Sequence, residues 1–205
     1  MFEKDIEHSF DDSIYVLRIQ DSGSSFSGGS GSRFTPESPY DYIVYNQHNK
    51  ECLCLELKST KNTSITIPKK SDLLKYQFYS TKNDKNEIKK YKNILKKQSI
   101  KYHQIISLYK AYNKGCNSYF LFNFSKYEKT YAMHIVDFLY FFIKTDKSSI
   151  NINDIIKYNG IEISFTKKRK NSTHCKYDLN IIFNNKRKDV PVWQRLLIAK
   201  SLFQT

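Results

Sequence analysis

Residues 51–60, ECLCLELKST, contain an alternation that constrains the fold more than any other stretch of the chain. Leucine occupies every second position, and a period of two indicates a β-strand that turns its apolar side chains toward a core. Residues 40–46, YDYIVYN, alternate in the same way, and the polar stretch QHNKE separates the two. We therefore expect an antiparallel hairpin over residues 41–58, whose second strand has one buried face and one polar face.

The other segments predict helices packed on a mixed sheet. Some have apolar residues at helical spacing, and others are short aromatic runs of the kind found in strands. The expected elements are helices over 1–10, 101–113, 137–143, 151–159 and 191–205, and strands over 14–19, 118–124 and 130–136. Gly115 and Asp137 stand where a C-terminal and an N-terminal helix cap belong. This order predicts an α/β fold (an α+β mixed sheet flanked by helices) in a single domain over residues 1–205.

The charge of the chain indicates an anionic partner. There are 34 Lys and Arg residues against 20 Asp and Glu, a formal net charge of +14. Nucleic acid is the leading candidate because each phosphate contact releases a bound counterion, and an acidic membrane surface is the second. The chain has no run of about 18 apolar residues to span a bilayer, so we expect no membrane insertion.

Cysteine usage and the N-terminus indicate a cytoplasmic protein. Cys52, Cys54, Cys116 and Cys175 lack the paired C-x-x-C spacing of a zinc site, and nothing indicates the secretion that favours disulfides. We interpret them as structural or incidental thiols in a reducing compartment. The first residues, MFEKDIEHSF, are acidic and mixed, unlike a secretory signal peptide.

Two segments interrupt the predicted elements. Residues 21–39 are rich in Ser and Gly and predict a flexible loop, which is either a plain linker or a loop that orders on a ligand. They lack the G-x-x-x-x-G-K-[ST] pattern, so no nucleotide cofactor is expected. Residues 61–100 form a lysine-rich insert, in which Ile88, Tyr91 and Leu95 give a helix one modest apolar stripe. This helix is either a solvated surface element or a DNA-facing one.

The candidate nucleic-acid contacts come from these two segments and from the basic run FTKKRK. Lysine and arginine side chains are the usual partners of phosphate oxygens. The predicted contacts are Arg33, Lys61, Lys69, Lys70, Lys167, Lys168 and Arg169.

Glu56 and Lys58 are separated by one residue, so on a strand they point to the same side, about 7 Å apart along the chain. Asp41 begins the preceding strand, and Gln104 lies early in the expected helix 101–113, so both can approach this pair. Carboxylate oxygens suit Mg²⁺, which can polarise a phosphodiester, and a lysine can stabilise the charge that grows on the phosphate. An edge strand with alternating charges produces the same Glu-x-Lys pattern without any catalysis.

Six stretches occur in the order found in a known nuclease family. They are FEKDI, SPYDYIVY, CLCLELKST, IKYHQIISL, SYFLFNF and TYAMHIVDF. By these stretches the chain resembles, over residues 1–180, the RecU-type Holliday-junction resolvases of the PD-(D/E)xK nuclease superfamily, particularly the phage-like members. The resemblance implies a bacterial or phage-encoded homodimer that nicks branched double-stranded DNA at four-way junctions and uses Mg²⁺, with Mn²⁺ as a substitute.

The resemblance also implies roles for individual side chains. Asp41 and Glu56 would bind the metal, and Gln104 would be a further metal-site residue. Lys58 would stabilise the transition state. Two other classes remain open: a restriction-type or other phage DNA endonuclease on the same fold, and a basic DNA-binding protein without activity.

Several features depart from the pattern of the family. Glu3 is the expected acid of the first helix, but Glu7 competes for that role. Residues 21–39 stand where some members have a long stalk that enters the junction, and the lysine-rich insert separates the Glu-x-Lys strand from the following helix. Pro39 occupies the position of a Thr that assists the metal site in relatives. A nuclease activity is therefore a firmer expectation than a preference for junctions.

Overall fold

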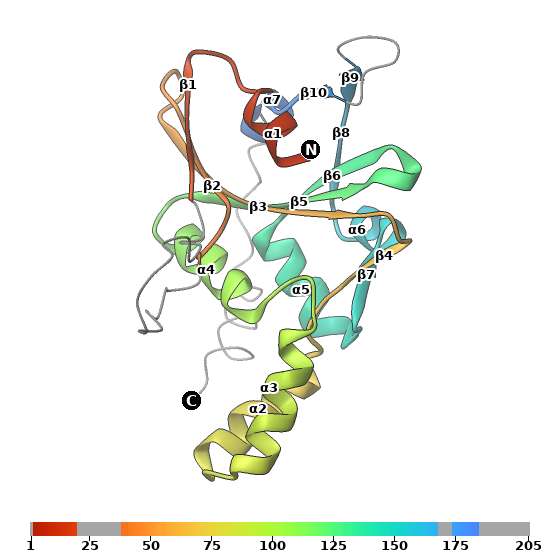
Figure 1. The fold of residues 1–205 in the computed structure, drawn as a ribbon. Helices are drawn as coiled ribbons and strands as arrows, with labels where there is room; N and C mark the ends of the chain where they lie inside the picture. The colour runs from red at the N-terminus through yellow and green to blue at the C-terminus, as the bar shows by residue number, and fades with distance from the viewer. Residues whose placement is uncertain (1, 20–37, 168–173, 185–205) are drawn as a thin grey trace, which may run out of the picture.

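The computed structural model of the protein describes residues 2–19, 38–167 and 174–184. Within these residues the centre of the fold is a six-stranded mixed sheet (Figure 1). In spatial order its strands are β1 (Ile14–Arg18), β2 (Tyr42–Asn46), β3 (Glu51–Thr60), β5 (Asn117–Phe124), β6 (Lys129–His134) and β8 (Ile161–Ile163).

β3 lies in the middle of this sheet and joins its two halves. It pairs antiparallel with β2 and parallel with β5, and β5 pairs antiparallel with β6. The predicted hairpin and the predicted second strand pair are both confirmed. A parallel pair needs a long crossover connection, and the segment between β3 and β5 supplies it. The crossover contains β4 (Ser64–Thr66), α2 (Lys70–Thr81), α3 (Lys85–Lys96) and α4 (Tyr102–Asn113).

Helices cover both faces of the sheet, as Figure 1 shows. α1 (Phe2–Glu7) and α7 (Asn180–Asn184) pack on the side that carries the leucines of β3, which we call the leucine face. α4 and α5 (Ile135–Thr145) pack on the opposite side, which carries Cys54 and Glu56 and which we call the acid face. Cys54 is 1% exposed and Glu56 0%. The expected half-buried strand is therefore wrong, because helices of a parallel crossover bury the second face of β3 as well.

The ends of two helices test the predicted caps. α4 ends just before Gly115, whose φ of 95° is a left-handed conformation that favours glycine, so this cap is confirmed. The expected cap Asp137 is wrong. β6 runs directly into α5, so the helix begins two residues earlier and His134 caps it by accepting a hydrogen bond from the Val136 N–H at 3.3 Å. Asp137 lies buried in the first turn instead and accepts from Asn159 Nδ2.

The lysine-rich insert forms two helices rather than the single helix expected. α2 and α3 pack against each other and project away from the sheet (Figure 1). Asp84 separates them because its side chain accepts the N–H groups of Asn86 and Glu87 and so caps α3. The rings of Tyr79 and Tyr91 stack between the helices at 5.8 Å. We call residues 69–101 the lysine arm.

Short elements complete the described residues. They are η1 (Ser125–Tyr127), β7 (Ser149–Asn151), which pairs with β4, α6 (Ile152–Lys157), and β9 (Phe165–Lys167), which pairs with β10 (Cys175–Tyr177). The predicted helix over 191–205 and all but the last two residues of the predicted loop 21–39 lie outside the described residues. Where the chain is described, no helix has the length and apolar character needed to cross a membrane.

Candidate active site

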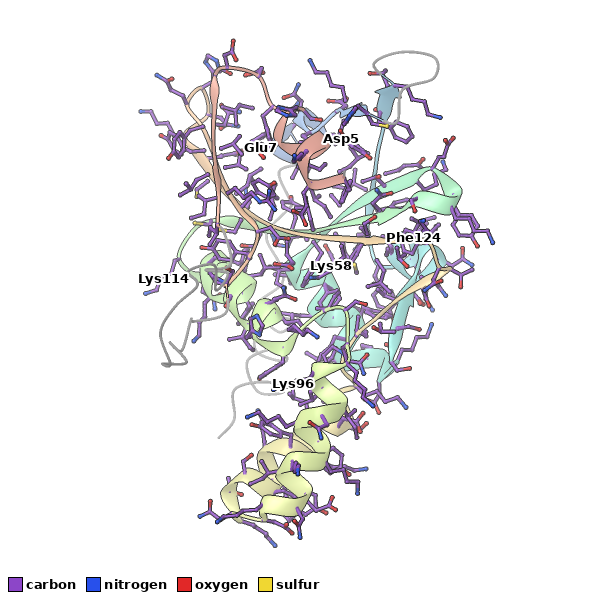
Figure 2. All side chains as sticks on the ribbon, in the orientation of Figure 1. Asp5, Glu7, Lys58, Lys96, Lys114 and Phe124 are labelled. Atoms are coloured by element: carbon purple, nitrogen blue, oxygen red, sulfur yellow. The ribbon has the colours of Figure 1, made fainter. Side chains whose placement is uncertain are left out.

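Glu56 stands at the centre of the sheet and is held there by two side chains. Its Oε1 atom lies 2.6 Å from Lys58 Nζ and accepts a hydrogen bond of 2.6 Å from Gln104 Nε2. The Glu56 side chain is 0% exposed and that of Lys58 17%. Figure 2 labels Lys58 on the side of the sheet that faces α5. The predicted approach of these three residues is therefore present in the structure.

The first turn of α4 orients the side chain of Gln104. It lies in the first turn of α4, where its Oε1 atom accepts the N–H of Lys101 at 2.9 Å. This bond reaches back to the helix N-cap and leaves the amide NH₂ to face Glu56. Ile105 and Leu108, both 0% exposed, anchor α4 in the core of the acid face. In this conformation Gln104 offers Glu56 a donor rather than a metal ligand.

Asp41 reaches the same point of β3 from the neighbouring strand. Its N–H donates to Leu55 O at 3.0 Å, which continues the β2–β3 ladder by one residue. At the next N–H of β3 the side chain of Asp41 is the acceptor, since Asp41 Oδ2 accepts the N–H of Leu57 at 2.7 Å. Leu57 follows Glu56 directly. The Asp41 carboxylate is therefore bonded to the residue next to the one that carries the Glu56 carboxylate.

Burying the charges of Glu56 and Lys58 costs free energy of folding, so their presence in the core calls for a reason. Moving an ion pair out of water costs several kcal/mol per ion, and the attraction within the pair recovers this only with good geometry. Apolar residues of similar size would fill the space between α4 and β3 at lower cost. Buried charges with a specific partner are typical of functional sites, although structural ion pairs also occur.

The first-helix acid lies elsewhere. Glu3 is exposed on α1, on the leucine face, and its side chain pairs with Arg18. Its backbone oxygen accepts from the Tyr42 hydroxyl at 3.3 Å. Glu7, the competing acid, is also exposed on α1. The structure thus places both acids on the side of the sheet opposite Glu56, and a role for either stays a prediction.

The predicted DNA contacts are distributed over the molecule. Lys61 and Lys69 are exposed, Lys70 is partly exposed at the start of α2, and Lys167 on β9 pairs with Glu128 at 2.8 Å. Arg33, Lys168 and Arg169 lie outside the described residues. Lys61 and Lys167 line one cavity, whereas Lys69 and Lys70 belong to the lysine arm. These four lysines therefore do not form one patch, and their contacts with DNA stay predictions.

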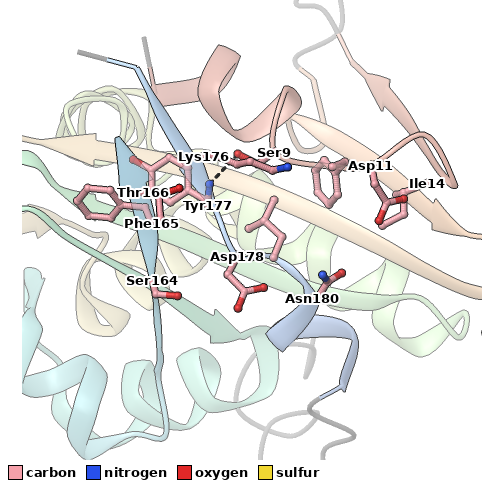
Figure 3. A pocket seen from close by; sticks show the side chains of 12 residues that line it. Ser9, Asp11, Ile14, Ser164, Phe165, Thr166, Lys176, Tyr177, Asp178 and Asn180 are labelled. Atoms are coloured by element: carbon pink, nitrogen blue, oxygen red, sulfur yellow. Dashed lines mark hydrogen bonds between the residues drawn. The ribbon is translucent and has the colours of Figure 1, made fainter. Parts of the chain in front are cut away.

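A separate cavity of about 300 Å³ lies at the side of α1, β9 and β10 (Figure 3). Its walls include Ser9 and Tyr177, which are joined by a hydrogen bond of 2.9 Å from the Tyr177 N–H to Ser9 Oγ. Ile14 and Leu179, both members of the leucine-face core, also line it. None of the predicted catalytic residues lines this cavity, so it offers no alternative centre for the predicted chemistry.

One cluster of ligand-type side chains was missed by the sequence reasoning. The Sγ atoms of Cys52, Cys54 and Cys116 lie within 4.8 Å of one another. The C-x-C pair was visible in the sequence, but the approach of Cys116 depends on the parallel pairing of β3 with β5. The available signal was the position of Cys116, two residues before the expected strand 118–124.

Comparisons with known proteins add little to this geometry. No protein-family model and no curated protein matches the sequence. One matching solved structure is that of Archaeoglobus fulgidus Hjc, a Holliday junction resolvase from an archaeal hyperthermophile. It is 13% identical with a TM-score of 0.37, and the match covers 73% of this chain and 83% of that chain.

Proposed function

We propose that this chain is a metal-dependent endodeoxyribonuclease of the PD-(D/E)xK type that acts on branched double-stranded DNA, in particular four-way junctions. The observation that carries the proposal is the buried contact of Glu56 with Lys58 and Gln104, with the Asp41 carboxylate bonded to the next residue of the same strand. The likeness to a Glu-x-Lys nuclease centre is in the arrangement of these side chains. The proposal therefore does not depend on similarity to any relative.

The donor set fits a hard divalent cation. Asp41 and Glu56 bring carboxylate oxygens from neighbouring strands to adjacent residues of β3, and Mg²⁺ or Mn²⁺ is bound by such oxygens together with water and phosphate. When bound, the ion supplies Lewis-acid polarisation of the phosphodiester and lowers the pKa of a bound water. Gln104 would hold the Glu56 carboxylate in position. A ligand role for its amide oxygen would require breaking the hydrogen bond from the Lys101 N–H.

Lys58 is the residue of this group best placed to meet a phosphate. Its side chain is 17% exposed whereas that of Glu56 is 0% exposed, so the ammonium lies between the buried acid and the surface. A cation held in this position stabilises the negative charge that develops on the phosphate in the transition state. The leucines of β3 contribute by anchoring the strand, since Leu53 and Leu55 are 0% exposed on the other face.

The lysine arm supplies the DNA-binding surface in this proposal. Residues 69–101 contain eleven lysines and three acidic residues, and α2 and α3 project from the sheet (Figure 1). A projecting basic helical pair can follow a duplex arm and bind its phosphates without reading sequence. A homodimer would place two such centres on one junction and account for paired nicks.

The alternative without catalysis has one observation in its favour. Glu56 is fully buried and its charge is balanced by Lys58, as in a structural ion pair. In that case the protein would bind DNA through its basic surface and leave it intact. A restriction-type or other phage endonuclease would share the centre and differ only in the DNA it selects.

One cleavage assay separates these functions. A labelled four-way junction and a duplex of the same sequence are incubated with the protein in Mg²⁺, Mn²⁺ or EDTA. Symmetric nicks near the crossover, lost in EDTA, support the junction nuclease, whereas cleavage at a duplex sequence supports the restriction-type enzyme. Lys58→Ala should lose cleavage, and Lys110→Ala, at an exposed position of α4, should keep it. If the wild type and Lys110→Ala bind the DNA but do not cleave it, just as Lys58→Ala does, the alternative without catalysis is supported.

A further inference from the structure

Two thiols of β3 and one thiol directly before β5 converge on the acid face of the sheet. The β3–β5 register places Leu53 opposite Asn117, so the preceding residues, Cys52 and Cys116, are neighbours across the strands. Cys54 follows Cys52 by two positions and therefore points to the same side. The three Sγ atoms lie within 4.8 Å of one another, and all three cysteines are free.

The end of α4 fixes the third thiol. The N–H of Cys116 donates to Ala111 O at 3.1 Å, which ties this residue to the last turn of the helix. The left-handed Gly115 turns the chain from α4 into β5 at this point. Cys116 is thus held by the same helix that carries Gln104 toward Glu56, and the thiol cluster is a product of the central fold rather than of a surface loop.

The cluster is buried on one side and open on the other. Cys54 is 1% exposed and belongs to the core of the acid face, whereas Cys52 and Cys116 are partly exposed. Zn²⁺ is bound by thiolates, so binding of an ion to these three cysteines at pH 7 would release their protons. The two partly exposed members give an ion a path from solvent.

We propose that Cys52, Cys54 and Cys116 bind one Zn²⁺ ion, with the fourth coordination position on the solvent side. Tetrahedral Zn²⁺ has Zn–S distances of about 2.3 Å, which places its sulfur ligands roughly 3.8 Å apart. Sulfur atoms that already lie within 4.8 Å reach this spacing by small side-chain rotations. Soft thiolates select Zn²⁺ over Mg²⁺, so this site is chemically distinct from the carboxylates of Asp41 and Glu56.

The bound ion would join the two central strands. Cys52 and Cys54 lie at the start of β3 and Cys116 directly precedes β5, so one ion bridges the parallel pair near the residues that carry Glu56 and Lys58. Binding to the folded chain alone stabilises it in proportion to the logarithm of the free ion concentration. A role in positioning β3 is therefore part of the proposal, and a catalytic role is not.

The test is a titration of the reduced, metal-free protein with Co²⁺ as a spectroscopic probe and with Zn²⁺ as its competitor. We expect one equivalent of Co²⁺ to produce a thiolate charge-transfer band and the visible absorption of a tetrahedral ion, and one equivalent of Zn²⁺ to remove both. Cys52→Ser and Cys116→Ser change partly exposed positions and should abolish the band. Cys175→Ser is the matched control, because Cys175 lies on β10 outside the cluster, and it should keep the band.

Three results would overturn the site. They are the absence of a thiolate band with Co²⁺, an equal loss of the band in Cys175→Ser, and a disulfide between Cys52 and Cys116 in protein purified without reductant but under exclusion of oxygen. The inference is independent of the nuclease proposal, since Glu56→Gln should bind Co²⁺ as the wild type does. A Zn²⁺-dependent rise in the thermal unfolding midpoint, present in Cys175→Ser and lost in Cys116→Ser, measures the same binding without spectroscopy.

Discussion

The Glu56–Lys58 pair leads to a stability prediction whose sign differs between single and double variants. The two charged atoms are 2.6 Å apart, and the Glu56 side chain is 0% exposed. Removing one partner of a buried pair costs about 3–5 kcal/mol, because the other charge stays buried without compensation. Lys58→Met leaves the carboxylate in the core, where it keeps the Gln104 amide. We therefore expect this variant to lose about 3 kcal/mol of the free energy of unfolding, the lower end of that range.

Removing the charge of Glu56 instead of that of Lys58 should lower the free energy of unfolding by less. Glu56→Gln leaves the Lys58 ammonium, whose side chain is already 17% exposed and can turn its charged end to water. We expect a loss of about 1–2 kcal/mol, the usual cost of one imperfectly replaced buried hydrogen bond. The double variant Glu56→Met/Lys58→Met has no buried charge, and such replacements are neutral or stabilising by about 1–4 kcal/mol. It should be at least as stable as the wild type and cleave no DNA.

Urea unfolding followed by far-ultraviolet circular dichroism measures all three variants. The midpoint should shift while the slope with urea stays constant, since the exposed area on unfolding is unchanged. Lys129→Met is the control, because the Lys129–Glu162 pair is 45% and 48% exposed and such pairs contribute about 0–1 kcal/mol. If Lys58→Met costs no more than Lys129→Met, the reasoning from the buried pair is refuted. A strongly destabilised double variant would show that the Glu56–Lys58 pair itself stabilises the fold.

Three further predictions concern the arm, the thiols and the assembly. Replacing Lys89, Lys92 and Lys96 of the lysine arm by Ala should weaken binding to any duplex DNA and lower the slope of log affinity against log salt by about 0.9 per lost phosphate contact, whereas Lys110→Ala should change neither. In the metal-free protein, burial raises the pKa of Cys54 from 9.0 to about 12, so the unfolded chain loses this proton first and the free energy of unfolding should fall as pH rises above 9. Cys54→Ala should flatten that fall, and an unchanged slope would contradict it. Light scattering should show a dimer at working concentration with or without DNA, and a monomer in both cases would count against paired nicks by one homodimer.

Local patterns were sufficient for much of the fold. The leucine alternation of residues 51–60 predicted β3 and its hairpin with β2, and the apolar spacing of residues 101–113 predicted α4 with Gly115 after its end. These features depend on neighbours within a few residues. The cap of α5 was misplaced because β6 leads directly into that helix, and His134 rather than Asp137 caps it by accepting the N–H of Val136.

The features that the sequence could not predict depend on distant contacts. Burial of the acid face follows from the parallel pairing of β3 with β5, which places α4 against Glu56. The same pairing brings Cys116 to the C-x-C pair. α2 was missed because its apolar residues do not gather in one stripe: Leu73 is buried, whereas Leu74 and Phe78 lie on the exposed side. The predicted grouping of Glu56 and Lys58 needed only the period of a strand, and the approach of Gln104 was expected from its place in the helix 101–113. Its role at the metal site came from the resemblance.

The most direct test of the central claim compares cleavage with binding in a single substitution. Glu56→Gln and the control Asp12→Asn, at an exposed position outside the site, are assayed on a labelled four-way junction in Mg²⁺ under single-turnover conditions, with binding measured in Ca²⁺. We expect both variants to bind the junction as the wild type does, and Glu56→Gln alone to lose cleavage by at least about 100-fold, as is usual when a group that acts in the transition state is removed. Cleavage by Glu56→Gln at the wild-type rate would contradict the assignment of Glu56 to the catalytic centre.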